Sequence, residues 1–165
     1  MSEPHLPAGK LLDRLTQPEL LLILLAFVFH FAWEMAQDPL YAGLSERPHG
    51  EVRNLCLLAA LGDVVIAFIA FYAAALVAGT RFWFIDAPPA PIAAWFITGL
   101  VITIALEFYA TRVNGRWNYG PLMPVVPALR IGVAPLLQWL AIPAILFFLM
   151  DRHFRGKRSI ERNSG

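Results

Sequence analysis

Four ionisable side chains interrupt otherwise apolar stretches of this sequence. His30 and Glu34 lie four residues apart in a run rich in leucine, phenylalanine and alanine, and Asp63 and Glu107 interrupt two later runs of the same kind. A carboxylic acid surrounded by apolar groups can stay protonated near neutral pH and serve as a general acid, with a second carboxyl beside it as the base. A histidine can relay protons between them. The four residues therefore predict acid–base chemistry, with all four as candidate catalytic residues.

Three further polar or aromatic residues belong with this set. The i, i+4 spacing of His30 and Glu34 stacks them on one helix face, and Gln37 extends the same stripe. Trp33 adjoins the stripe, and Gln138 lies within the last apolar run. We therefore take Trp33, Gln37 and Gln138 as candidate substrate-binding residues.

The elements that carry these residues are four long apolar runs, at residues 19–37, 55–79, 91–110 and 131–150. They raise the hydrophobic content to 58% and lower the charged content to 15%, against about 25% charged residues in a soluble domain. Each run reaches the roughly 20 apolar residues needed to cross a bilayer, where the backbone must be helical. The sequence therefore predicts an all-α integral membrane protein, with four transmembrane helices in one bundle spanning residues 1–165.

An amphipathic loop is expected between the third and fourth helices. Residues 112–130 combine three arginines, two asparagines and two aromatic residues with prolines that prevent a regular helix. Such a loop can cap a pocket, and its candidate substrate-binding residues are Arg116, Trp117, Asn118 and Tyr119. An aromatic belt with arginine anchors at the membrane interface is the open alternative.

The basic residues predict the orientation in the membrane. Four spans place both termini on one side, which carries eight lysines and arginines against five on the other side. The positive-inside rule then puts both termini, including a basic tail at residues 151–165, in the cytoplasm. In that orientation the intramembrane polar groups all fall in the outer leaflet, which predicts a shared pocket opening outward. We expect the inner membrane of a bacterium.

Other kinds of partner find little support in the sequence. A net charge of +1 indicates no nucleic-acid partner. Carboxylates with an imidazole suit iron, manganese or zinc, so a metal at His30, Glu34, Asp63 and Glu107 is not excluded. The apolar runs contain only one histidine, however, whereas ferritin-like di-iron sites use a Glu-x-x-His pair on each of two helices. No cofactor is predicted.

Two patches of the chain resemble known membrane cyclases. "FAWEMAQDPLY" followed by "LGDVVIAFIAFY" resembles the fungal and bacterial integral-membrane terpene cyclases, which have a Trp-Glu in one span and an acidic residue in the next. The resemblance implies protonation of a prenylated substrate by Glu34, with Trp33 beside it, and Asp63.

The second patch is "ATRVNGRWNYGPLMP…RIGVAPLLQW", which resembles the small membrane lycopene cyclases. Trp117 and Tyr119 match the Trp-x-Tyr of that family, but Leu136, Leu137 and Gln138 follow Pro135 where the family has acidic residues. The four-span outline as a whole is similar to that of uncharacterised small bacterial membrane proteins.

These observations favour a membrane enzyme that cyclises or isomerises an isoprenoid or other lipid by proton transfer. An epoxide or an already polarised double bond is the more plausible target, because protonating an unactivated alkene demands a strong acid. The expected partners are membrane lipid and a hydrophobic small-molecule substrate, and the sequence sets no oligomeric state. Two alternatives stay open: a non-catalytic carrier that holds a lipid, cofactor or ion in the pocket, and an accessory subunit whose polar cluster only sets helix register.

Overall fold

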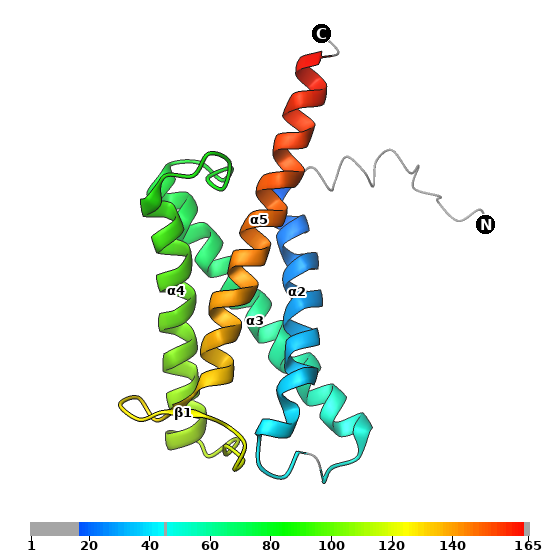
Figure 1. The fold of residues 1–165 in the computed structure, drawn as a ribbon, viewed down its shortest axis with the longest axis vertical. Coiled ribbons are helices and arrows are strands. Elements are labelled where there is room, and N and C mark those ends of the chain that lie inside the picture. The colour runs from blue at the N-terminus through cyan, green and yellow to red at the C-terminus, as the bar shows by residue number, and fades with distance from the viewer. Residues whose placement is uncertain (1–16, 45, 164–165) are drawn as a thin grey trace, which may run out of the picture.

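The protein is an antiparallel bundle of four long helices. The computed structural model describes residues 17–44 and 46–163. The long helices are α2 (Pro18–Gln37), α3 (His49–Ala78), α4 (Pro89–Phe108) and α5 (Val133–Asn163), as Figure 1 shows. Short elements lie between them: η1 (Asp38–Leu40), the π-helical turn η2 (Tyr109–Val113), and the strands β1 (Val125–Val126) and β2 (Ile131–Gly132). The expected all-α fold is confirmed.

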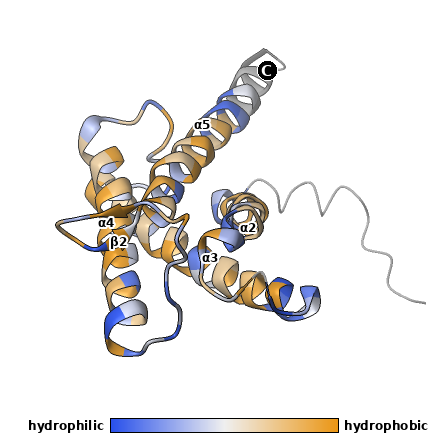
Figure 2. Ribbon diagram, turned by 60° about the horizontal axis from the view of Figure 1, so that its bottom comes forward, coloured by the Kyte–Doolittle hydropathy of each residue, from blue (hydrophilic) through white to orange (hydrophobic). Residues whose placement is uncertain are grey.

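The outer surface of the bundle is suited to lipid. All four helices are long and apolar enough to cross a membrane. Apolar residues colour most of each helix in Figure 2, while the polar residues gather toward the ends. Large apolar side chains stay exposed on every helix, among them Val28, Leu76, Val101 and Phe148. Water would penalise such a continuous apolar surface, whereas hydrocarbon does not, so this is a multi-pass membrane protein.

Two helix boundaries differ from the expected ones. Helix α3 begins at His49 rather than at residue 55, and α5 continues through the basic tail to Asn163 instead of ending near residue 150. Hydropathy marks where a chain leaves an apolar environment. Backbone hydrogen bonding can continue beyond that point, so the polar first turns of α3 and the basic last turns of α5 remain helical.

The two ends of the bundle are built differently (Figure 1). At one end, here called the loop end, lie the connection from α2 to α3 and the segment 114–132 with its two strands. The opposite end, the tail end, carries the connection from α3 to α4 and the last turns of α5. There Trp83 and Phe84 are buried in the main core with Phe154, and Arg155 forms an ion pair with Asp86.

Small residues let α3 pack closely in the bundle. Ala60, Ala67, Ala70 and Ala74 are almost fully buried and are spaced along one face of that helix. Close backbone approach through small residues is the usual basis of helix association in membranes, because lipid supplies no hydrophobic force between helices. Helix α3 thereby packs against its neighbouring helices at the level of the bundle's polar side chains.

A glycine in α4 makes room for a tryptophan of α5. Gly99 faces the indole of Trp139, and a Cβ atom at this position would overlap the ring carbons Cε3 and Cζ3. Trp139 is 1% exposed, and its indole is also held by the hydrogen bond from Nε1 to Asp63 Oδ1. The absence of a side chain at Gly99 therefore sets the position of the Trp139 indole.

We expect Gly99→Ala to lower the free energy of unfolding by roughly 1–3 kcal/mol, the usual effect of overpacking a core. Thermal unfolding of the detergent-solubilised protein would measure it. Gly62→Ala is the matched control, because nothing lies within 4 Å of a Cβ atom at Gly62. Equal stability of the two variants would contradict the proposed role of Gly99.

Candidate functional site

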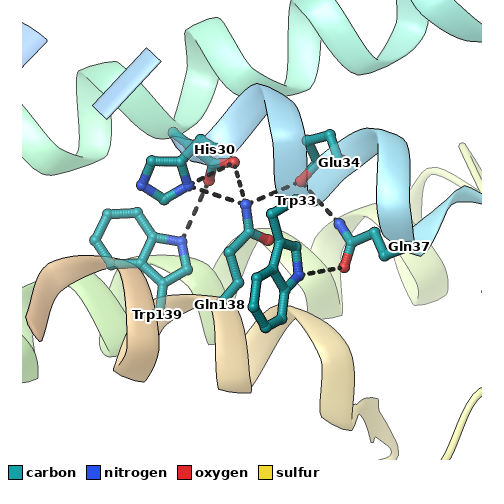
Figure 3. A network of polar contacts seen from close by, with 7 residues as sticks. His30, Trp33, Glu34, Gln37, Gln138 and Trp139 are labelled. Atoms are coloured by element: carbon teal, nitrogen blue, oxygen red, sulfur yellow. Dashed lines mark hydrogen bonds and ion pairs between the residues drawn. The ribbon is translucent and has the colours of Figure 1, made fainter. Parts of the chain in front are cut away.

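One amide nitrogen joins polar side chains from three helices (Figure 3). Gln138 Nε2 of α5 donates to Glu34 Oε1 of α2 at 3.1 Å and to Asp63 Oδ2 of α3 at 3.0 Å. The same nitrogen lies 2.9 Å from His30 Nδ1. An amide nitrogen carries two hydrogens, so it can donate to only two of these three atoms at once. His30 Nδ1 accepts from Gln138 or donates to Asp63 according to its tautomer.

His30 and Trp139 support the Asp63 carboxyl. His30 is completely buried and its Nδ1 lies 3.3 Å from Asp63 Oδ2, so a proton between these atoms can reside on either one. Trp139 Nε1 donates to the other carboxyl oxygen, Asp63 Oδ1, at 3.2 Å. The ring centroids of His30 and Trp139 are 5.3 Å apart. Asp63 therefore has a donor on each oxygen and is held in a single orientation.

Glu34 is oriented from its own helix. Gln37 Nε2 donates to Glu34 Oε1 at 2.8 Å, and Trp33 Nε1 donates to Gln37 Oε1 at 3.1 Å (Figure 3). These three residues lie within one turn of α2, as their spacing predicts. Cys56 Sγ of α3 lies 3.6 Å from the backbone oxygen of Glu34, which keeps the two helices in contact at this level.

A cavity of about 440 Å³ borders this network toward the loop end. Glu34, Asp63 and Glu107 all contribute to its wall, and the volume is within the usual range for small-molecule sites. Of the other candidate residues, four also line the cavity: Gln37, Arg116, Trp117 and Gln138. His30 and Trp33 lie behind the wall and reach it only through their hydrogen bonds.

Glu107 belongs to the cavity but not to the Gln138 network. Its Oε2 accepts a hydrogen bond of 2.5 Å from the hydroxyl of Tyr119, and Thr111 Oγ1 donates to its backbone oxygen at 2.7 Å. Glu107 is only 7% exposed. The third carboxyl is thus paired with the loop between α4 and α5, separately from Glu34 and Asp63.

The segment 114–132 is tied across the loop end. Ala42 N donates to Asn118 O at 2.9 Å and Gly120 N donates to Leu40 O at 2.8 Å, so the segment pairs with the connection after α2. Asn118 acts here through its backbone, and Arg116 lies over the ring of Trp117 at 5.7 Å. Of the residues expected to cap a pocket, Arg116 and Trp117 line the cavity, while Asn118 and Tyr119 are not among its lining residues.

Sequence reasoning missed several residues that the fold places at this site. Trp139 was outside the candidate set although it follows Gln138 directly, and Tyr41 and Arg47 line the cavity from the connection between α2 and α3. Cys56 is buried and also lines the cavity. The only sequence signal for Trp139 is its neighbour, because a tryptophan in an apolar run is otherwise an ordinary packing residue.

The residues described by the structure include no group of three or more His, Cys, Asp or Glu side chains placed to hold a metal ion. Comparison of the chain with models of protein families, with curated proteins and with solved structures finds no match.

Tyr119 should remain protonated at alkaline pH. Burial, reinforced by the hydrogen bond to Glu107, raises the pKa of Tyr119 above its usual value near 10. A raised pKa in the folded state means that this contribution to stability is fully present below about pH 10 and is lost only as the pH rises through the folded-state pKa. We expect the ultraviolet titration of wild type and Tyr119→Phe to coincide up to about pH 10. An ionising tyrosine that disappears in Tyr119→Phe at lower pH would contradict this.

Proposed function

We propose that this protein is a membrane enzyme that cyclises or isomerises an isoprenoid or other lipid by proton transfer. The observation that supports it most directly is the shared hydrogen bond of Gln138 Nε2 with Glu34 and Asp63, beside a cavity with largely apolar walls. Apolar walls suit a lipid chain, and two carboxyl groups held close together suit an acid and a base.

Glu34 and Asp63 divide the proton between them. No lysine or arginine is within ion-pair distance of either group among the residues described, so with His30 neutral two negative charges here would repel each other. The pair then holds one proton. Both donors to Glu34 reach Oε1, which leaves Oε2 to carry that proton, whereas Asp63 has a donor on each oxygen, so we assign Glu34 as the acid and Asp63 as the base. His30, in contact with Asp63, exchanges the proton that Asp63 collects.

The reaction needs no second reactant. Glu34 protonates the oxygen of an epoxide or of a carbonyl conjugated to a double bond, and the electron deficiency passes to carbon. A neighbouring double bond attacks that carbon and forms the new carbon–carbon bond, or the electrons redistribute without ring closure. Loss of a proton from the adjacent carbon to Asp63 restores the charge balance, so the product is an isomer of the substrate.

Gln37 and Gln138 orient the two carboxyl groups, while Arg116 and Trp117 cover the loop end of the cavity. Preorganised hydrogen bonds of this kind avoid reorientation during proton transfer. Glu107, paired with Tyr119, supplies a further carboxyl in the wall. The proposed location is the inner membrane of a bacterium, with both termini cytoplasmic and the loop end outward, supported by the eight-to-five distribution of basic residues.

Glu34→Gln and Asp63→Asn should each abolish conversion while preserving the fold. Both changes keep side-chain volume and hydrogen bonding but remove the exchangeable proton, and loss of general acid–base catalysis typically lowers rates by about 10²–10⁴-fold. Native mass spectrometry of the gently solubilised wild-type protein would first identify the bound lipid. Its conversion by each variant would then be followed by chromatography.

The control for this experiment is Glu51→Gln, an exposed carboxylate at the start of α3 outside the cavity, which should behave as wild type. Full conversion by Glu34→Gln would rule out its role as acid. A lipid that stays bound but is never converted by wild type would instead favour the carrier function.

Fusions after Met150 test the orientation. A green fluorescent protein fused there should fluoresce, because it becomes fluorescent on the cytoplasmic side of the membrane. Alkaline phosphatase at the same place should be inactive, because it becomes active only after export. A matched fusion at Gly115 in the segment between α4 and α5 should give the opposite pattern. Active phosphatase after Met150 would reverse the proposed orientation and the leaflet that the cavity faces.

A further inference from the structure

A buried hydroxyl in the cavity wall has no partner in the protein. Thr103 of α4 is 6% exposed and lines the cavity, one helical turn from Glu107. Its Oγ1 forms no hydrogen bond with any of the residues described by the structure. A buried hydroxyl without a hydrogen bond lowers the stability of the folded protein. Valine would fill the same space as threonine, so packing alone does not explain the hydroxyl at this position. A polar ligand in the cavity that accepts a hydrogen bond from the hydroxyl would explain it.

The cavity also opens sideways between α3 and α4. Leu58, Ala59 and Gly62 of α3, Leu106 of α4 and Tyr109 of η2 all line it, and all five are exposed. A Cβ atom at Gly62 would have no heavy atom within 4 Å. In a membrane this opening faces lipid, because the exposed surface around it is apolar.

We propose that the ligand of this cavity is an isoprenoid or related chain lipid bearing a carbonyl or epoxide oxygen. Its oxygen accepts a hydrogen bond from Thr103 Oγ1, and its chain leaves the bundle through the α3–α4 opening past Gly62. The inference rests on the proposed function and adds the residue that holds the substrate's oxygen and the opening through which its chain leaves. Thr103 is a positioning residue that orients the oxygen toward the carboxyl groups, and the chain remains in the bilayer throughout.

This assignment agrees with the limited acidity of a buried carboxyl. An oxygen is far more basic than an isolated alkene, so an oxygenated substrate can be protonated by a carboxylic acid. A hydrogen bond from Thr103 would polarise a carbonyl further and would hold either oxygen in a fixed place. A hydrocarbon of the same length could enter the same opening but would leave the Thr103 hydroxyl unpaired in the complex.

The test compares two probes on the full-length protein in nanodiscs: farnesylacetone, an isoprenoid ketone, and the hydrocarbon with the same carbon chain. Native mass spectrometry reports how much of each is bound, and quenching of the cavity tryptophans gives the affinity. Wild type should bind the ketone roughly 3–10-fold more tightly, the value of one net hydrogen bond. Thr103→Val should lose this preference, and Thr103→Ser should retain it.

Stability separates a ligand contact from a structural role. Thr103→Val removes an unpaired buried hydroxyl without changing the side chain's volume much, so its melting temperature should equal or exceed that of wild type. A lower melting temperature together with an unchanged ketone preference would show that Thr103 is structural. An unchanged preference alone, or equal binding of the two probes by wild type, would also overturn the oxygen contact.

The opening is tested with two glycines of the same helix. Gly62→Phe should weaken binding of both probes about equally, because it fills the exit of the chain. Gly50→Phe is the matched control, since Gly50 also has free space around it but lies outside the cavity. Wild-type binding by Gly62→Phe would place the entrance elsewhere.

Failure of this inference is distinguishable from failure of the proposed function. If Glu34→Gln kept full conversion while Thr103→Val lost ketone binding, the acid assignment would be wrong and the ligand class would stand. If Glu34→Gln lost conversion while Thr103→Val kept its preference for the ketone, Glu34 would stand as the acid and the contact of Thr103 with the ligand's oxygen would be wrong.

Discussion

The arrangement of this bundle depends on satisfying polar groups where no water is available. Glu34, Asp63 and His30 lie in helices whose surroundings are apolar, and each unpaired polar group there would be strongly unfavourable. Gln138 contributes to this from a third helix, because one amide nitrogen lies within hydrogen-bond distance of all three side chains, while His30 Nε2 has no partner among the residues described. The positions of α2, α3 and α5 relative to one another are therefore coupled at this point, with only small movements compatible with all the contacts.

The same contacts explain why the site is rigid on one side and open on the other. Behind the Gln138 network, His30 and Trp139 are buried, and Gly99 allows the indole to lie directly against α4. In front of it, the walls of the cavity include small or exposed residues such as Ala59 and Gly62. Proton transfer to a bound lipid requires hydrogen-bond donors that hold the carboxyl group in place from its buried side. It also requires free volume for the lipid on the side of the cavity.

The loop end adds a second level of organisation. Tyr119 couples the segment between α4 and α5 to Glu107, while backbone hydrogen bonds join that segment to the connection after α2. The polar cover is thereby attached to α4 and to the connection between α2 and α3, both of which contribute residues to the cavity wall. Any ligand reaching the carboxyl groups without disturbing this cover would pass through the apolar opening between α3 and α4, which again favours a lipid that stays within the bilayer.

The sequence by itself determined the fold class and the four helices, because a run of about 20 apolar residues has few alternatives to a membrane helix. It also determined that His30, Glu34 and Gln37 share a stripe, since that follows from helical spacing alone. Only the tertiary structure decided that Asp63 and Gln138 meet this stripe while Glu107 pairs with Tyr119. Rotation of one helix against another depends on packing details, such as the space that Gly99 leaves for Trp139, and apolar runs of similar composition do not encode which faces come together.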